Sequence, residues 1–594
     1  MAHPSAERHA SKRRRAKPVV TEGARHLPAE TPPAHDAIRL EGADWLIALG
    51  LALITVAVFL PALANGFVWD DDVNFVGNPS YRGLGWTQLR WMFTSAHLGH
   101  YIPLTWMTLG FDHVLWGMNP RGYHATNLLL HAANAGLLYL LALRLMAAAW
   151  PAAPEERGGV RLGAAGAALL FALHPLRVES VAWITERRDV LSGLLAFLTV
   201  LAYLRACRER APAWRRRWYW VALGLFVLAL LSKSMLVTLP VILLVLDVYP
   251  LRRLSGDLRR WVEPAGWPVL AEKIPFVLAS LAASVVALLA VREAGAAVSL
   301  SEVGWAGRAA IVAYGFGFYL WKTLAPLGLS PLYEVPSGLT LFDPRCLLGL
   351  SLAVAISALV IARRRRWPWL TAAWVTYLVT LLPVVGIVHN GPQIAADRYS
   401  YLPTVAWALL AGAGVRLAWR LWQTGRLGRA PAVALAALGI ACLVALAGLT
   451  WRQIPVWRDA EALWGHALRT APSGFAHASL GVALAQRGRL DAAIAHYRDA
   501  LRIKPSLAIV HYNLANALAD QGHAAQAVTH YREALRLRPG DPDTHYNLAF
   551  TLAAQGQTLP AIDHYRQALQ INPRFREARA NLDRLLRARE RAKE

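Results

Sequence analysis

The sequence predicts an all-α fold, made of a helical bundle that crosses a membrane many times and a soluble solenoid of helical repeats that follows it. Three observations support this prediction. The 594-residue chain is 56% hydrophobic and only 17% charged, which is outside the usual composition of soluble domains. Its basic residues gather beside long apolar stretches, and its C-terminal part repeats with a period of 34 residues. We expect a tail over residues 1–42, a membrane domain over 43–450 and a repeat domain over 451–594.

The tail is polar, basic and Pro-containing, and it lacks the small-residue cleavage site after a short apolar core that a secretory signal would show. We therefore expect residues 1–42 to be a disordered cytoplasmic tail. The first apolar stretch, 45–64, has no charge and matches the about 20 residues that cross the hydrocarbon core of a bilayer. It is the first expected span.

Ten further apolar stretches bring the expected number of spans to eleven. They lie near residues 124–149, 161–175, 190–204, 218–232, 235–250, 274–291, 346–362, 369–388, 402–419 and 432–450. The stretch 308–326 is also apolar, but counting it as a span would place the four arginines of 363–366 on the outer side. We therefore expect 308–326 to form an amphipathic or re-entrant helix in an outer loop.

The formal charge of +24 could suggest a nucleic-acid partner, but the basic residues do not form one groove-sized face. Most of the excess lies beside apolar stretches, in residues 1–42, 205–217, 252–260, 363–366 and 416–429. This distribution follows the positive-inside rule, so we expect these segments in the cytoplasm and no nucleic-acid partner. An odd number of crossings then places the repeats outside, in the periplasm or a lumen. The Arg- and Ala-rich composition favours a bacterial inner membrane.

The repeats are recognisable from residues that recur every 34 positions. Proline closes successive units, glycine marks the turn between two helices, and alanine and tyrosine mark the helix contact, as in Pro505, Pro539 and Pro573, Gly488, Gly522 and Gly556, Ala493, Ala527 and Ala561, and Tyr497, Tyr531 and Tyr565. This is the tetratricopeptide pattern, in which each helical pair buries its apolar face against its neighbours. The polar, basic residues 574–594 are expected to form the solvating cap helix.

One position of the repeat carries a further feature, because Asn513, Asn547 and Asn581 occupy it while Ser479 stands there in the first repeat. Amides repeated at one position can hydrogen-bond an extended peptide backbone. We therefore expect these asparagines to bind an acceptor peptide. The alternative is that they satisfy backbone groups between helices.

Ionisable residues next to apolar spans are costly, so those at the expected outer ends are functional candidates. Asp70, Asp71 and Asp72 follow the first span directly in FVWDDDVNFVGNP. Neighbouring carboxylates repel one another, which favours a base and a charge stabiliser at the membrane surface, although a solvated helix cap would also explain them. The other candidates on this side are His174, Arg177, Glu179, Arg187, Arg188, Asp189, Lys233, His389, Asp397 and Arg398.

Carboxylates that activate a hydroxyl, together with Arg and Lys that hold a phosphate, are the groups that transfer from a phosphate-linked donor requires. A divalent cation, Mg²⁺ or Mn²⁺, is an open alternative beside the three aspartates, with Asp70 and Asp72 as its ligands. Cys207, Cys346 and Cys442 have no zinc-site spacing and form no disulfide framework.

Several of these motifs occur in an order that resembles a known family. FVWDDDVNFVGNP, HPLRVESVAWITERRDVLS, LSKSMLVTLPVILLVLD, EKIPFVLAS and ADRYSYLP, with the repeats behind them, resemble the transmembrane and tetratricopeptide repeat-containing protein O-mannosyltransferases and their bacterial relatives. These are GT-C glycosyltransferases, polytopic enzymes that use lipid-phosphate-linked sugars. The resemblance covers about residues 43–594.

The resemblance implies that Asp70 and Asp71 are the acidic pair of the first loop, with Asp72 as an additional acid. It also implies that Arg187, Asp189 and Lys233 are donor-site residues. The chain differs from the animal members at Ile102, where they usually have Arg, and at Ser234, where they have Glu. The implied reaction is one inverting displacement, in which Asp70 or Asp71 deprotonates a Ser or Thr hydroxyl while Arg187, Lys233 or Arg398 stabilises the departing lipid phosphate. His174 would orient a carboxylate.

Two other functions stay open on the sequence alone. One is a lipid-linked glycan ligase or polymerase whose acceptor is a glycan, with repeats that recruit partners. The other is a non-catalytic scaffold in which the repeats assemble an envelope complex and the spans only anchor them. A scaffold does not need acids collected on one face, so the sequence favours a protein glycosyltransferase with a polyprenyl-phosphate sugar as its donor.

Overall fold

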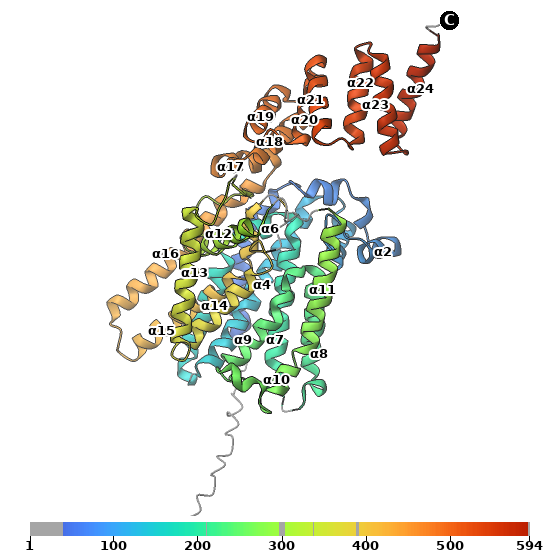
Figure 1. Ribbon diagram of the computed structural model, residues 1–594. Helices are drawn as coiled ribbons and strands as arrows, with labels where there is room; N and C mark the ends of the chain where they lie inside the picture. The colour runs from blue at the N-terminus through green and yellow to red at the C-terminus, as the bar shows by residue number, and fades with distance from the viewer. Residues whose placement is uncertain are drawn as a thin grey trace, which may run out of the picture. The chain divides into compact units, whose positions relative to one another are not determined.

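The computed structural model describes residues 40–591 except 152, 210, 296–302, 337, 388–390 and 392. The expected tail lies almost wholly outside the described residues. The described part belongs to one unit, Ile38–Glu594. It is almost entirely helical, which confirms the predicted all-α fold (Figure 1).

Sixteen helices precede the repeats in the described part of the chain. They are α1 Gly42–Phe59, α2 Trp86–Thr94, α3 Pro103–Trp116, α4 Pro120–Ala149, α5 Arg157–Ala172, α6 Val178–Ala182, α7 Arg187–Ala206, α8 Arg217–Ser232, α9 Leu239–Val248, α10 Trp267–Ala271, α11 Ile274–Glu293, α12 Trp305–Leu324, α13 Pro344–Arg363, α14 Pro368–Leu381, α15 Thr404–Gln423 and α16 Arg429–Gln453. The strands β1 Tyr333–Glu334 and β2 Gln393–Ala395 form a small antiparallel ladder.

Six of the described helical segments are long and apolar enough to cross a membrane. They are Gly42–Ala64, Pro120–Ala149, Ile184–Ala206, Trp267–Glu293, Pro344–Arg363 and Arg429–Trp457. A seventh span results if Arg157–Ala172 and Pro175–Ala182, bent by 56° against each other, count as one. The eleven expected spans all fall on helices, but α8, α9 and α14 are short, so the number of crossings stays a prediction.

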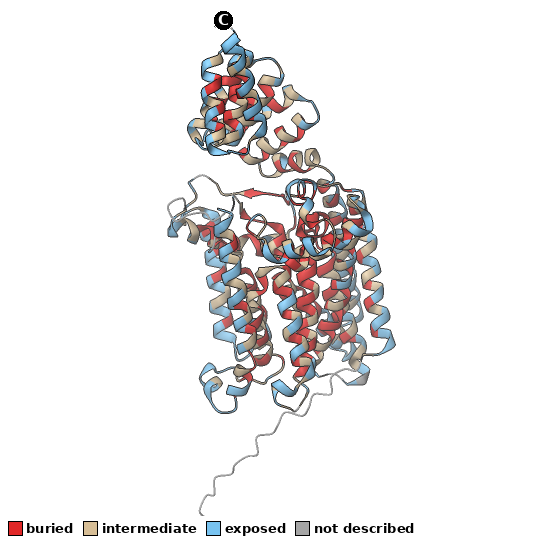
Figure 2. Cartoon of the chain, turned by 90° about the vertical axis from the view of Figure 1, so that its right-hand side faces the viewer, coloured by how far each residue is buried: buried red, intermediate tan, exposed pale blue. Residues whose placement is uncertain are grey.

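Figure 2 shows buried residues gathered inside the helical bundle. α4 and the segment that contains α7 are the most deeply buried of the six long apolar segments. α7 packs along α8, and α5 packs along α15 and α4. The contact of α5 with α15 depends on glycine, because a Cβ added at Gly412 would lie 2.3 Å from the carbonyl oxygen of Gly163. Backbones of small residues can approach this closely, which is a common way for membrane helices to associate.

The segment expected as an amphipathic or re-entrant helix, 308–326, lies largely in α12. α12 is one continuous helix of 20 residues that packs against α13, and it is not among the six segments that are long and apolar enough to span. Its unbroken course does not fit a re-entrant loop, whereas an amphipathic helix remains consistent with it. A second core, built on α12, α13 and α14 with β1 and β2, lies around it.

The repeats fold as successive helical pairs. The helices are α17 Ala460–Thr470, α18 Gly474–Gln486, α19 Leu490–Ile503, α20 Ala508–Asp520, α21 Ala524–Leu537, α22 Pro542–Ala554, α23 Thr558–Ile571 and α24 Arg576–Arg591. Each packs mainly on the helix before and after it. Gly488, Gly522 and Gly556 have positive φ of 73°, 81° and 77° at the turn inside each pair, a conformation that favours glycine. α24, with only Ala578 and Leu582 buried, closes the series.

Candidate functional site

The three neighbouring aspartates have three different environments. Asp71 is fully buried and accepts hydrogen bonds from Val68 N (3.0 Å), Thr185 N (2.9 Å) and Thr185 Oγ1 (2.6 Å). Asp72 is exposed and begins a π-helical turn. Asp70 lies between these extremes and lines a pocket. Asp71 therefore fixes the loop after α1 to the turn before α7, and Asp70 is the carboxylate that faces open space.

The backbone beside Asp70 is strained. Trp69, directly before it, has φ of +57°, and Leu98, which also lines the pocket, has φ of +49°. Non-glycine residues rarely adopt this conformation, and such strain is concentrated at functional sites. The Trp69 indole holds the conformation in place, because it stacks on Trp183 with ring centroids 4.7 Å apart.

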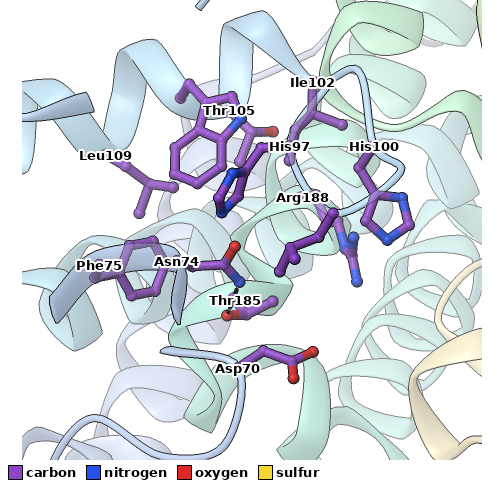
Figure 3. A pocket seen from close by; sticks show the side chains of 12 residues that line it. Asp70, Asn74, Phe75, His97, His100, Ile102, Thr105, Leu109, Thr185 and Arg188 are labelled. Carbon is purple, nitrogen blue, oxygen red and sulfur yellow. Dashed lines mark hydrogen bonds between the residues drawn. The ribbon is translucent and has the colours of Figure 1, made fainter. Parts of the chain in front are cut away.

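The pocket has a volume of about 90 Å³ and receives side chains from four segments (Figure 3). They come from the loop after α1, the loop between α2 and α3, the start of α3, and the turn into α7. The lining residues are Asp70, Asn74, Phe75, His97, Leu98, His100, Ile102, Thr105, Trp106, Leu109, Thr185 and Arg188. Burial and the nearby Arg188 lower the pKa of His100 to about 3, so its ring is neutral. Burial raises the pKa of Asp70 above its usual 3.8, while Arg188 and Arg398 act in the opposite direction.

A buried cluster of charges lies beside the pocket, with Glu186 at its centre. Glu186 accepts from Arg188 Nη2 at 2.5 Å and pairs with Arg398 Nε at 3.2 Å and Lys233 Nζ at 3.3 Å. Lys233 also pairs with Asp189. Three cations from distant parts of the chain thus share one carboxylate, and two of them act electrostatically on Asp70.

Arg398 ties the segment after β2 to this cluster. Its Nη1 donates to Glu179 Oε1 at 2.5 Å, its backbone N–H donates to Glu179 Oε2 at 2.8 Å, and its guanidinium lies 5.4 Å from the centre of the Trp183 ring. Asp397 points elsewhere, because it accepts from the Tyr333 hydroxyl at 3.1 Å, and burial raises its pKa well above 3.8. His389 lies outside the described residues.

None of the predicted donor-site residues lines the pocket itself, and two of them, besides Asp397, also lie outside the charged cluster. Arg187 is fully buried and donates to Asp112 Oδ2 (2.6 Å), the Tyr123 carbonyl (2.8 Å) and Asn127. His174 accepts from Leu176 N at 3.3 Å and donates from Nε2 to the Thr323 carbonyl at 3.0 Å. Both side chains therefore tie segments of the fold together, and neither lines the pocket.

Sequence reasoning did not single out Glu186 and His100, and it gave Arg188 no role of its own. Glu186 and Arg188 stand in the quoted motif ITERRD, where two adjacent arginines offer no way to decide which faces the site. The structure separates them because successive helical residues point about 100° apart. Ile102 and Ser234 are the two positions at which the chain differs from the animal members. Ile102 is an apolar residue in the pocket wall, and Ser234 begins the 3₁₀ turn after Lys233.

The aspartates do not converge on one point that could hold a cation. Asp71 already accepts three hydrogen bonds, and Asp72 does not line the pocket. Among the residues that the structure describes, the one group of three side chains spaced for a metal ion lies in the repeats.

An apolar groove of about 200 Å³ runs along the bundle between α4, α7, α9, α14 and α15. Leu236 and Leu402 line it, and they follow Lys233 and Arg398 by three and four residues. Tyr249 and Pro250, beyond the other end of α9, line it as well. The groove therefore extends from near the charged cluster to the opposite end of the bundle.

The predicted asparagines of the repeats differ in their partners. Asn547 donates to the Tyr512 hydroxyl at 3.0 Å and to Asn516 Oδ1 at 3.1 Å, and Asn581 donates to the Tyr546 hydroxyl at 3.2 Å. Both amides thus connect one repeat to the preceding one. Asn513 has Ala478 where the other two have tyrosine, so it lacks this contact.

Four tryptophans connect the site to the first repeat helix. Trp69 stacks on Trp183 and meets Trp464 of α17 edge-on at 5.1 Å, and Trp183 stacks on Trp457 at 5.4 Å. The Gly66 N–H also donates to the Arg458 carbonyl at 2.9 Å. The loop that carries Asp70 is therefore in direct contact with the start of the repeats.

Comparison with family models identifies the repeats. Models described as "TPR repeat" match residues 481–522 and 516–556, and one described as "Tetratricopeptide repeat" matches 542–575. Two solved structures match with low overall similarity. "YrrB: a TPR protein with an unusual peptide-binding site" is 16% identical, covers 39% of this chain and 98% of its own, and has a TM-score of 0.20. "APC/C hetero-tetramer Cut9-Hcn1" is 14% identical, covers 92% of this chain and 97% of its own, and has a TM-score of 0.23.

The curated homologues of the chain are protein O-mannosyl-transferases. Human "Protein O-mannosyl-transferase TMTC1" is 26% identical over 504 residues, which is 75% of this chain and 53% of the relative. Mouse TMTC4 is 25% identical over 500 residues, 76% of this chain and 65% of the relative. Mouse TMTC2 is 32% identical over 218 residues, 35% of this chain and 24% of the relative. The chain thus spans about half the length of TMTC1.

Proposed function

We propose that this chain is a membrane glycosyltransferase that moves a sugar, mannose by analogy with its homologues, from a polyprenyl-phosphate donor to Ser or Thr hydroxyls of proteins held by the repeat array. The observation that carries the proposal is the position of Asp70, a half-buried carboxylate that lines a pocket next to three clustered cations. The names of the homologues support the type of reaction.

The cations are suited to hold the donor phosphate. Arg188, Lys233 and Arg398 share Glu186, and a phosphate would give them acceptor oxygens in addition to this carboxylate. Because the cluster is buried, the attraction is stronger than it would be in water. We assign this role to Arg188 rather than to Arg187, since Arg188 lines the pocket, whereas Arg187 does not and is held by Asp112, Asn127 and the Tyr123 carbonyl.

The apolar groove supports a lipid-linked donor. A polyprenyl chain is a long hydrocarbon, and the groove is lined almost entirely by apolar side chains, including those of α9 and α15, which follow Lys233 and Arg398 in the chain. With the phosphate at the cations, the chain would leave along Leu236 and Leu402. The anomeric carbon would then lie toward the pocket that Asp70 lines.

The transfer is one displacement with inversion. Asp70 accepts the proton of the acceptor hydroxyl, and the hydroxyl oxygen forms its bond to the anomeric carbon as the bond from that carbon to the phosphate oxygen breaks. The electron pair of the broken bond leaves with the lipid phosphate, whose charge Arg188, Lys233 and Arg398 stabilise. Asp71 positions Asp70 through its hydrogen bonds to Val68 and Thr185.

The acceptor is delivered by the repeats. Asn513 has Ala478 at the position where Asn547 and Asn581 have tyrosine, whereas a peptide would have to share Asn547 and Asn581 with Tyr512 and Tyr546. A weakly held acceptor beside the pocket has a high effective concentration there, which favours transfer without tight binding. We place this end of the bundle and the repeats on the periplasmic or lumenal side.

The test compares Asp70→Asn with Asp72→Asn in the purified protein, supplied with polyprenyl-phosphate mannose and a Ser/Thr-containing peptide. We expect a loss of about 10²- to 10⁴-fold in transfer for Asp70→Asn, the usual contribution of a general base, and near-normal transfer for Asp72→Asn. Full activity of Asp70→Asn would refute the assignment.

Glycoproteomics of membrane and exported proteins from cells with the two variants separates the other functions. Loss of glycans from proteins supports the proposal. Loss of a glycan from lipid-linked material alone would indicate the glycan-acceptor enzyme, and unchanged glycosylation with Asp70→Asn would indicate the scaffold.

A further inference from the structure

The repeats carry paired histidines that the Asn positions do not explain. In each of three repeats, a histidine on the first helix faces one on the second with their Nδ1 atoms 3.1 Å apart. The pairs are His477 with His496, His511 with His530, and His545 with His564. Each pair lies 34 residues after the previous one, so the three sites are matched in backbone and differ only in their surroundings.

The first pair has an acid beside it. Asp499 lies one turn after His496 on α19, and its Oδ2 is 3.9 Å from His477 Nδ1. Ligand atoms of His477, His496 and Asp499 all lie within 4.8 Å of one another, and no other group of this kind occurs in the described ranges. The side chains of His477 and Asp499 are 17% and 35% exposed, so an ion can reach them from solvent.

We propose that His477, His496 and Asp499 form a binding site for a divalent transition-metal ion, with Zn²⁺ as the ion that suits it best. Zn²⁺ binds imidazole nitrogen and carboxylate oxygen at about 2.0–2.2 Å, and ligands around a tetrahedral ion then lie somewhat more than 3 Å apart. The two nitrogens already have this separation. The carboxylate oxygen, 3.9 Å from His477 Nδ1 and within 4.8 Å of both nitrogens, must move closer to bind the ion, and the fourth position is left for water.

The second and third pairs do not offer the same site, because their histidines are satisfied without an ion. His511 Nε2 donates to the Pro505 carbonyl at 3.1 Å, and His545 Nε2 donates to the Pro539 carbonyl at 3.0 Å. Their unprotonated Nδ1 atoms therefore accept a hydrogen bond from the Nδ1–H of the partner ring. Ala471 stands at the corresponding position in the first repeat, and within the described residues His477 Nε2 makes no such bond.

The acid also distinguishes the three repeats. Asp499 pairs with Arg502 through Oδ1 at 2.8 Å, which leaves Oδ2 for a metal ion. Glu533 takes its place in the second repeat, and both its oxygens accept from Arg536, at 2.7 and 2.9 Å. In the third repeat the residue is Gln567, which carries no charge. Only the first site therefore combines two imidazoles with a carboxylate oxygen that is not engaged by arginine.

Bound metal would join α18 to α19 at the first repeat, next to α17. The inference rests on the repeats alone and is independent of the proposed transfer reaction. Its experiment uses the full chain in detergent, freed of metal with a chelator and then given Zn²⁺ alone. Bound zinc per chain and the thermal stability of the protein are measured.

We expect one zinc ion per chain and a higher melting temperature when it binds. His496→Ala and Asp499→Asn should each weaken zinc binding by at least about tenfold, whereas the matched control His564→Ala in the third repeat should leave it unchanged. Circular dichroism of the apo variants checks that the helices are formed, and Asp499→Asn keeps the size of the side chain if His496→Ala is poorly folded.

Cobalt provides a second measurement, since four-coordinate Co²⁺ gives much stronger visible absorption bands than a surface-bound ion in an octahedral water shell. Their appearance in the wild type and loss in Asp499→Asn support the site. Absence of stoichiometric zinc binding, or an equal loss in His564→Ala and His496→Ala, would overturn it.

Discussion

At the residue scale, adjacent side chains in this protein have separate roles that depend on burial. Asp70, Asp71 and Asp72 are equivalent in the sequence, but only Asp70 faces the pocket, while Asp71 anchors the loop and Asp72 faces solvent. Sequence reasoning could identify the acidic motif because charge beside an apolar span is costly. It could not separate its three members, because that requires knowing that Thr185, 114 positions away, donates to Asp71.

Arg187 and Arg188 are also adjacent side chains with different roles, and the difference can be tested. Arg187 is the partner of the buried Asp112, whereas Arg188 shares Glu186 with two other cations. Arg187→Ala leaves Asp112 without its cation, so we expect it to destabilise the fold by about 3–5 kcal/mol. Arg188→Ala should keep the fold and weaken donor binding. Thermal melting and the KM for the donor are the two measurements.

A shared phenotype would contradict this division of roles. If Arg188→Ala unfolded the protein as readily as Arg187→Ala, Arg188 would be structural. If Arg187→Ala melted normally and lost donor affinity, the phosphate role that the sequence suggested for Arg187 would be restored. Arg187→Lys is the milder variant to use if Arg187→Ala does not yield folded protein.

At the element scale, apolar runs and the 34-residue period located nearly every helix, because each long helix must bury or expose a continuous apolar surface. The period was sufficient for the repeats, where glycine at positive φ marks each turn. α12 was harder, since the charges near its ends and its partial burial against α13 do not separate a tilted helix from a loop. The broken pair α5 and α6 was also not predictable, because a bend of 56° at Pro175 depends on what packs around it.

The crossing of α5 and α15 can be tested at one glycine. A Cβ at Gly412 would meet the Gly163 carbonyl oxygen at 2.3 Å and the Ala167 side chain at 2.8 Å, so the helices must separate to accept it. We expect Gly412→Leu to lower the stability by about 1–3 kcal/mol or more, as overpacking does. Gly414→Leu, on the same helix with open space around it, is the control. Equal melting temperatures for the two variants would show that the contact is not close.

The histidine pairs make the stability of the repeat helices depend on pH. Burial lowers the pKa of His477, His530 and His564 below the usual 6.5, although nearby Asp499, Glu533 and Asp563 act in the opposite direction. The unfolded chain therefore takes up protons first as the pH falls, so the stability that neutral histidine provides is present above about pH 6.5 and is lost below it. Charging both rings of a pair also breaks their Nδ1 contact.

We expect metal-free protein to show faster hydrogen exchange in α18–α23 at about pH 5 than at about pH 7.5, after correction for intrinsic rates. Replacing His545 and His564 together by alanine should remove the effect in α22 and α23 and leave it in α20 and α21. Hydrogen exchange that is independent of pH in all three repeats would show that protonation of the histidine pairs does not lower the stability of the helices.

At the scale of the whole molecule, the repeats are not simply appended to the bundle. Trp464 of α17 meets Trp69 beside Asp70, Asn65 Nδ2 donates to the Ile454 carbonyl at 3.4 Å, and His466 donates to the Leu329 carbonyl at 2.8 Å. The sequence predicted a membrane domain and a repeat domain, and the distribution of basic residues predicted that the acidic candidates and the repeats share one side of the membrane. It could not predict that they share an aromatic cluster, because stacking between residues 69 and 464 has no local pattern.

This contact predicts that the start of the array affects acceptor use. Trp464 is buried between Trp69 and Phe475, and Trp464→Ala would leave a cavity beside the strained residue that precedes Asp70. We expect transfer to a protein acceptor to fall by about tenfold or more, since small displacements of a reacting group are costly. The KM for the lipid donor should change little, because the ring contacts of Trp464 are with Trp69 and Phe475 and not with Arg188, Lys233 or Arg398. Trp464→Phe should restore most of the activity.

Trp451→Ala, at the exposed end of α16, is the matched control, since it removes the same ring from a surface that packs on nothing comparable. If Trp464→Ala and Trp451→Ala were equally active, the array would deliver acceptors without touching the Asp70 loop. If Trp464→Ala instead raised the donor KM as strongly as Arg188→Ala, the tryptophan cluster would be part of the donor site. The expected pattern, a loss in turnover that a phenylalanine rescues, would mean that the first repeat helix helps to hold Asp70 where the acceptor hydroxyl arrives.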